Sequence, residues 1–161
     1  MSTADPTGPE GSSGWPGVAG AFVGVALTSL VGRWLVADDA GIVPAMGASA
    51  VLFFGLPRGA VSSPWSALAG NVVSAVVGVA CARLIPEPTV AAACAVAAAL
   101  GAMGLLRCVH PPGGAVALLA VVGGPAVRQA GFVYVLMPVA INAAVMLAVA
   151  TAYARLRPRP G

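Results

Sequence analysis

Charged residues are scarce in this chain, and their scarcity excludes an ordinary soluble fold. Only 8% of the 161 residues are charged, against about 25% in an average soluble domain. Lysine is absent, all eight basic residues are arginine, and the acidic residues number five. Hydrophobic residues make up 59% of the chain, and the mean hydropathy is +0.95. Most of the outer surface must therefore face lipid, and we expect an integral membrane protein.

Groups that build active sites and metal centres are also scarce. The chain has one histidine, His110, and three cysteines without Cys-x-x-Cys spacing, so a set of metal ligands is not expected. No carboxylate pairs with the histidine, and no Ser-His-Asp set is expected inside a membrane. The net charge of +3 is too small and too dispersed for nucleic-acid binding. We expect no enzyme, no metal, no cofactor and no nucleic-acid partner.

What the chain does contain is long apolar segments. Four of them, at about 17–36, 65–84, 89–109 and 131–154, reach the roughly 20 residues that cross a bilayer. Two others, near 43–56 and 113–123, are too short for a straight crossing and begin at Pro/Gly clusters. We predict an all-α polytopic membrane protein with four long transmembrane helices and two short broken or re-entrant helices, in one domain over 16–156. Residues 1–15 are predicted to be a disordered leader, and 157–161 a short basic tail.

The two halves of the chain resemble one another, which we interpret as an internal two-fold repeat over 17–84 and 89–156. The matching motifs are Pro44-x-x-Gly47-Ala48-x-Ala50-x-Leu52 and Pro111-x-x-Gly114-Ala115-x-Ala117-x-Leu119. If the short segments cross the membrane, the halves are inverted, as in many transporters. If the short segments are re-entrant, each half has two spans and the halves are parallel. The arginine distribution favours six crossings only slightly, so both topologies stay open.

Small residues recur at every fourth position in all four long segments. The series are Gly20/Gly24/Thr28/Gly32, Gly70/Ser74/Gly78/Ala82, Ala93/Ala97/Gly101 and Ala140/Ala144/Ala148/Ala152. In lipid no hydrophobic effect drives helices together, and small residues at this spacing let their backbones approach closely. The four series therefore predict a tightly packed bundle.

The octapeptide over 107–114 separates two apolar segments and is the predicted functional site. It contains the only histidine, an arginine and two consecutive prolines, which must interrupt a helix. Such residues are costly in a membrane bundle and are tolerated where protein or a water-filled cavity satisfies the freed backbone. Two short helices beginning at Pro/Gly clusters would also place two electropositive N-termini inside the protein. Facing each other, these ends would bind an anion. The alternative is that both breaks are kinks that serve packing.

Each side chain of the predicted site has two interpretations. Arg107 would attract an anion, or would extend its charge to the lipid headgroups. His110 would couple proton movement to transport, or would hydrogen-bond to a freed carbonyl. The hydroxyl of Ser49 and the amides of Asn71 and Asn142 lie inside apolar stretches. They would bind substrate, or would more commonly form hydrogen bonds between helices. The candidate substrate-binding residues are Gly47, Ala48, Ser49, Asn71, Arg107, His110, Gly113, Gly114 and Asn142.

The motifs resemble the HPP family of integral membrane proteins, which is named for the tripeptide found here as His110-Pro111-Pro112. The supporting stretches are residues 44–57, residues 110–115 and a Pro-Val-x-x-Asn run over 138–142. The family is usually described as a four-span unit, and some members are similar to nitrite transporters. The resemblance thus implies a small-anion carrier or channel.

We therefore expect a transporter or channel for a small inorganic anion such as nitrite, with protons as a second possible solute. The alternative is a non-transporting membrane accessory or scaffold module. Arg155, Arg157 and Arg159 predict a cytoplasmic C-terminus under the positive-inside rule. We expect the protein in a bacterial inner membrane, in contact with the lipid bilayer, and so small a unit is a candidate for a homo-oligomer.

Overall fold

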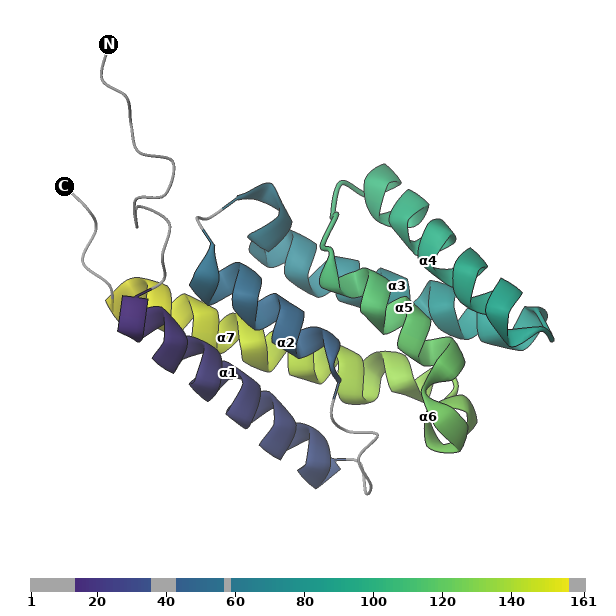
Figure 1. The fold of residues 1–161 in the computed structure, drawn as a ribbon, viewed down its shortest axis with the longest axis horizontal. Helices are drawn as coiled ribbons and strands as arrows, with labels where there is room; N and C mark the ends of the chain where they lie inside the picture. The colour runs from purple at the N-terminus through teal and green to yellow at the C-terminus, as the bar shows by residue number, and fades with distance from the viewer. Residues whose placement is uncertain (1–13, 36–42, 57–58, 157–161) are drawn as a thin grey trace, which may run out of the picture.

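The computed structural model describes residues 14–35, 43–56 and 59–156, and all of its regular elements are helical (Figure 1). The long helices are α1 (Gly14–Leu35), α3 (Pro64–Leu84), α4 (Pro88–Leu105) and the pair η4 (Val135–Ala140) and α7 (Ile141–Leu156). The short ones are α2 (Ala45–Ala50), its wider continuation η2 (Val51–Gly55), η3 (Ala60–Ser62), α5 (Pro112–Val122) and α6 (Gly124–Ala130). Four helices are long and apolar enough to cross a membrane. The predicted all-α membrane fold is confirmed.

Three boundaries differ from the sequence prediction. The third long helix ends at Leu105 because Arg107 adopts a left-handed conformation, with φ of 52°. A separate short helix, α6, follows α5 at an angle of 97° and was not predicted. Gly131, with φ of 53°, then ends α6, so that the last long helix begins at Val135. The predicted leader lies outside the described residues except for Gly14 and Trp15, which begin α1, and the predicted tail lies wholly outside them.

The short helices carry the chain from one end of the bundle to the other. Gly20 of α1 faces Phe54 of η2 and Tyr153 of α7, and Trp65 of α3 donates a hydrogen bond to the Leu106 carbonyl after α4. We call this end of the bundle, where α1 and α3 begin and η2, α4 and α7 end, the N-terminal end. Successive elements run in alternating directions, α2 and α5 included (Figure 1). The short helices thus run along the bundle, although only the four long helices, or five if the bent pair α5 and α6 counts as one span, have the length and apolar character to cross a membrane.

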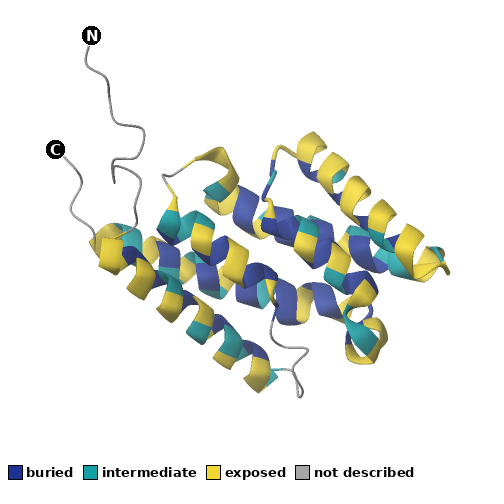
Figure 2. Ribbon diagram, viewed as in Figure 1, coloured by how far each residue is buried: buried dark blue, intermediate teal, exposed yellow. Residues whose placement is uncertain are grey.

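Helix α3 lies at the centre of the packing and contacts α4, α5, η4 and α7. Two of its glycines allow α5 and the loop before it to approach. A Cβ on Gly70 would come within 2.7 Å of both the Cys108 carbonyl oxygen and His110 Cβ. A Cβ on Gly78 would come within 2.6 Å of the Ala117 carbonyl oxygen. Figure 2 shows the result, with α3 and α5 largely buried and the outward faces of α1 and α4 exposed.

The small-residue series are correct for two helices and wrong for two. In α1 the residues Gly20, Gly24, Thr28 and Gly32 are all buried, and in α3 the series is buried up to Gly78. The α4 series instead faces outward, and Ala91, Ala95, Ala99 and Met103 are the buried positions. The α7 series is likewise largely exposed, and the buried residues there are Asn142, Ala143, Met146 and Ala150. In helices so rich in alanine, more than one face shows the four-residue spacing, so spacing alone does not select the packed face.

We predict that Gly78→Ala destabilises the protein by about 1–3 kcal/mol, the usual cost of forcing extra volume into a packed core. The added methyl would meet backbone atoms of Ala117, which cannot rotate away. The measurement is reversible unfolding in mixed micelles by denaturing detergent. Gly101→Ala in α4 is the control, because a Cβ there meets no atom within 4 Å, and alanine should keep or raise stability by up to about 1 kcal/mol. Equal stability of the two variants would contradict the close approach of α3 and α5.

Candidate functional site

His110 is fully buried in the segment between α4 and α5, and it joins three parts of the chain. Its Nδ1 lies 2.7 Å from the Val61 carbonyl oxygen of η3, and its Nε2 lies 3.1 Å from Ser49 Oγ of α2. A carbonyl oxygen only accepts hydrogen bonds, so Nδ1 carries a hydrogen. In the neutral ring the Ser49 hydroxyl then donates to Nε2. The single histidine therefore connects the second half of the chain to two elements of the first half.

The end of α4 and the start of α5 fix the position of this histidine. The Arg107 N–H donates to the Gly104 carbonyl and the Cys108 N–H to the Met103 carbonyl, which is the Schellman arrangement of a helix C-terminus. Glycine normally occupies the left-handed position in this motif, which Arg107 takes here. Pro111 and Pro112 then begin α5 without needing amide partners. The turn therefore reverses the chain and directs His110 into the bundle.

A polar face of α3 lies against the histidine segment. Gly70 contacts this segment, and Asn71 and Ser74, one turn apart on the same helix, are both buried. Ser74 Oγ lies against Gly113, where a Cβ would come within 2.6 Å of it. Asn71 Nδ2 donates to the Ala67 carbonyl at 2.7 Å. The start of α5 thus rests directly on the polar face of α3.

Two buried atoms of this face have no hydrogen-bond partner among the described residues. These are Asn71 Oδ1 and Ser74 Oγ. Leaving a buried polar atom unsatisfied costs about 1–3 kcal/mol. A small polar solute or an ordered water could satisfy buried groups of this kind.

The nine predicted residues differ in burial. Ser49, Asn71, His110, Gly113 and Asn142 are buried, whereas Gly114 is half-buried and Gly47, Ala48 and Arg107 are exposed. Ser49 and His110 are hydrogen-bonded, and Asn71 and Gly113 belong to the α3 contact beside them. Asn142 lies on α7.

The backbone donors at the starts of the short helices already have partners. The N–H groups of Gly113 and Gly114 donate to the His110 and Pro111 carbonyls, at 2.8 and 3.1 Å. The N–H groups of Met46 and Gly47 donate to the Val43 and Pro44 carbonyls. An anion at these helix ends would therefore have to share hydrogen bonds that the chain already makes. The side chains of α2, α3 and the histidine segment are the more available groups.

Sequence reasoning missed two residues that belong to this region. Ser74 was assigned only to the small-residue series, although its position three residues after Asn71 puts the two on one helix face. Phe53 was not considered at all. Its ring packs against the imidazole of His110, with centroids 6.1 Å apart and an interplanar angle of 33°.

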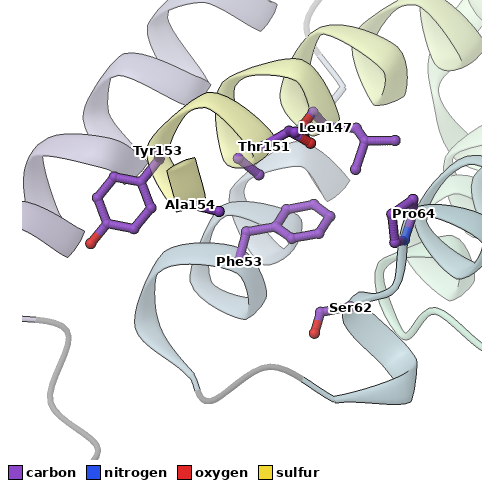
Figure 3. Close-up of a pocket in the computed structure, with 8 residues that line it drawn as sticks. Phe53, Ser62, Pro64, Leu147, Thr151, Tyr153 and Ala154 are labelled. Carbon is purple, nitrogen blue, oxygen red and sulfur yellow. Dashed lines mark hydrogen bonds between the residues drawn. The ribbon is translucent and has the colours of Figure 1, made fainter. Parts of the chain in front are cut away.

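Phe53 also lines a partly open pocket of about 230 Å³ (Figure 3). The pocket lies between η2, η3, the start of α3 and the last turns of α7. Its lining consists of Phe53, Ser62, Pro64, Leu147, Ala150, Thr151, Tyr153 and Ala154. None of the nine predicted residues lines it, and Phe53 is the side chain that connects it to His110.

No group of three or more histidine, cysteine, aspartate or glutamate side chains that could hold a metal is found in residues 14–35, 43–56 and 59–156. The three thiols are free, with Cys108 buried, Cys81 half-buried and Cys94 exposed. Buried thiols in such surroundings pack as small apolar groups. The chemistry of the site therefore depends on hydroxyl, amide and imidazole groups.

Comparison with known proteins gives one family and two relatives. The chain matches the family described as HPP, transmembrane region, over residues 8–160. A transmembrane protein of Dictyostelium discoideum is 34% identical over 140 residues, which cover 83% of this chain and 44% of the relative. A second transmembrane protein of the same organism is 33% identical over 157 residues, which cover 91% and 54%. The chain spans about half the length of these curated relatives. No solved structure matches it.

We predict that the imidazole of His110 carries its hydrogen on Nδ1 and that Ser49→Ala changes the environment of Nε2 alone. The Val61 carbonyl holds the Nδ1 hydrogen, whereas Ser49 is the partner of Nε2. The measurement is the ¹⁵N spectrum of histidine-labelled protein, in which His110 gives the only pair of ring signals. A ring whose only hydrogen is on Nε2 would contradict the bond to Val61.

Proposed function

The chain belongs to the HPP transmembrane family, and from that premise we propose that it transports a small inorganic oxoanion, nitrite first, together with a proton. The family match and the two transmembrane relatives support a multi-pass membrane protein. The choice of solute rests on the chemistry of the buried polar groups and on the family resemblance of the motifs.

The observation that carries the proposal is the pair of unpartnered atoms Asn71 Oδ1 and Ser74 Oγ. Both residues are at most 1% exposed, inside a helix whose neighbours present mainly apolar side chains. A scaffold that only needed to pack would fill these positions with alanine or leucine at lower cost. A solute that supplies the missing partners explains why the polar groups are there.

The two atoms are complementary to an oxoacid that holds its proton. The Ser74 hydroxyl can donate to one oxygen of the solute, and Asn71 Oδ1 can accept from the protonated oxygen. Arg107, the charged residue of the histidine segment, is exposed. Carrying the proton with the anion avoids placing a bare charge in this low-dielectric interior.

His110 and Ser49 provide the route for that proton. Nδ1 stays bound to the Val61 carbonyl, so Nε2 is the nitrogen that gains and loses a hydrogen. When Nε2 gains one, it donates to the Ser49 hydroxyl instead of accepting from it, and the heavy atoms can keep their positions. Such a switch lets the imidazole titrate inside the bundle while it continues to hold η3.

In our proposal the remaining predicted residues surround the site formed by Asn71, Ser74 and His110. Gly113 lets the start of α5 lie directly against Ser74, and Asn142 on α7 faces the core. Gly47, Ala48 and Gly114 belong to the ends of the short helices, where backbone amides add a weak positive potential. Arg107 attracts anions at the N-terminal end of the bundle. We place that end in the cytoplasm of a bacterial cell and the protein in its inner membrane, because Arg157 and Arg159 follow Arg155 there.

Removal of the Ser74 hydroxyl should weaken nitrite uptake. Loss of one net hydrogen bond of about 0.5–1.5 kcal/mol predicts a roughly 2- to 10-fold rise in the apparent KM of Ser74→Ala. The measurement is nitrite uptake into proteoliposomes under an imposed proton gradient. Thr28→Val is the matched control, since it also deletes a buried hydroxyl, but one bonded to carbonyls of its own helix at 3.0 Å.

Equal KM values for the Ser74 variant, the Thr28 variant and the wild type would remove the α3 face from the binding site. Absence of protein-dependent nitrite uptake in the wild type would overturn the transport proposal and leave the accessory module as the better description.

Replacement of Arg107 by glycine separates the effect of this residue on the stability of the fold from its attraction of the anion. Arg107→Gly should stabilise the fold by roughly 1 kcal/mol, because a left-handed residue with a Cβ is strained. The same variant should raise the apparent KM for nitrite, and the increase should shrink at high ionic strength, where exposed charges are screened. Unfolding in micelles and uptake at two salt concentrations measure both effects. An unchanged KM at low salt would exclude Arg107 from the route.

A further inference from the structure

We propose that the pocket of Figure 3 is the vestibule through which the solute reaches His110, and that the Phe53 ring is the gate between them. The assignment of the solute rests on the proposed function. The position of the gate rests on geometry alone and has its own test.

The pocket lies at the N-terminal end of the bundle, as defined above. Ser62 and Pro64 border the start of α3, and the α7 residues of the lining lie between Leu147 and Ala154, within about 14 Å of the helix end at Leu156. Pro64 and Thr151 are exposed, and Ala150 is buried, so the pocket leads from the surface inward. A cavity in this position connects the aqueous interface with the interior.

One ring and one peptide group separate the pocket from the imidazole. Phe53 lines the pocket and packs against the His110 ring at 6.1 Å. Ser62, which also lines the pocket, directly follows Val61, whose carbonyl oxygen holds His110 Nδ1. A solute in the pocket would need only a rotation of Phe53 to approach the histidine.

Phe53 and its neighbour Phe54 differ in their freedom to move. Phe54 is 3% exposed and packs edge-on against Tyr153, with centroids 5.1 Å apart, and its ring fills the space beside Gly20 and Gly24 of α1. Phe53 is half-buried and borders open space on its pocket side. Figure 3 shows its ring projecting from η2 toward α7. Phe53 packs against the core on one side only, so its rotation disturbs less packing than a rotation of the buried Phe54 would.

The lining suits a small, uncharged or protonated polar solute. Hydroxyl groups come from Ser62 and Thr151, the Tyr153 hydroxyl points away from the other lining residues (Figure 3), and the remaining lining residues are apolar. Among the described residues, no charged side chain lines the pocket. A volume of about 230 Å³ accommodates several waters, or an oxoacid with part of its hydration shell.

The gate is tested by chemical modification of the only histidine with diethyl pyrocarbonate, followed by mass spectrometry of the peptide that contains His110. In the wild type the fully buried imidazole should react slowly. In Phe53→Ala the reagent should reach it from the pocket, with a rate on the order of tenfold higher, because no opening step is then needed. Phe54→Ala is the control for general loosening. A Phe53 variant no faster than the wild type, or a Phe54 variant equally fast, would overturn the gate.

The vestibule is tested by filling it. Thr151→Trp should abolish most nitrite uptake, whereas Ala148→Trp, on the exposed face of the same helix, should leave it intact. Normal uptake by Thr151→Trp would exclude the pocket as the route of the solute. That result is expected if the pocket holds a lipid chain instead. If the wild type itself takes up no nitrite, the transport proposal fails, and the modification experiment still decides whether Phe53 shields His110.

Discussion

The close approach of α3 and α5 is the contact on which the rest of the structure depends. Lipid supplies no hydrophobic force between helices, so backbone proximity and hydrogen bonds must provide the cohesion. Gly70 and Gly78 let the histidine segment and α5 lie directly on α3, and Gly113 does the same from the other side. Because the backbones touch there, His110 lies deep enough to meet Ser49 and Val61. The glycines therefore build the site as well as the core.

Burying polar side chains costs free energy, and close packing of the helices does not require them. His110, Ser49, Asn71 and Ser74 are all buried in a bundle whose outer faces are apolar. The first two are satisfied by one another and by Val61, and Asn71 and Ser74 each retain an unpartnered atom. The satisfied pair holds the two halves of the chain together, and the unpartnered atoms of Asn71 and Ser74 are the ones to which our proposal assigns the solute. Phe53 contacts the imidazole of the ordered pair and borders the pocket that reaches the surface.

The sequence predicted the helices well because hydropathy and proline placement act locally. All four long segments and both short ones are present, and the His-Pro-Pro segment leads the buried histidine into the core. Packing faces were predictable only where glycine marked them, in α1 and α3; in α4 and α7 alanine occupies several faces alike. The roles of Phe53 and the Val61 carbonyl could not be predicted. Each depends on a contact with His110, which follows at least 49 positions later in the sequence. Arg107 was expected near the site, and only the left-handed turn reveals that its side chain lies outside the core.

The positions of the first and last helix ends have a consequence for architecture. The start of α1 and the end of α7 lie at the same end of the bundle (Figure 1). In longer relatives that keep this arrangement, a soluble module can be added before the first helix or after the last without inverting the domain. Two such modules would share a cellular environment and could meet each other. In such a relative the bundle would hold the two modules on the same side of the membrane.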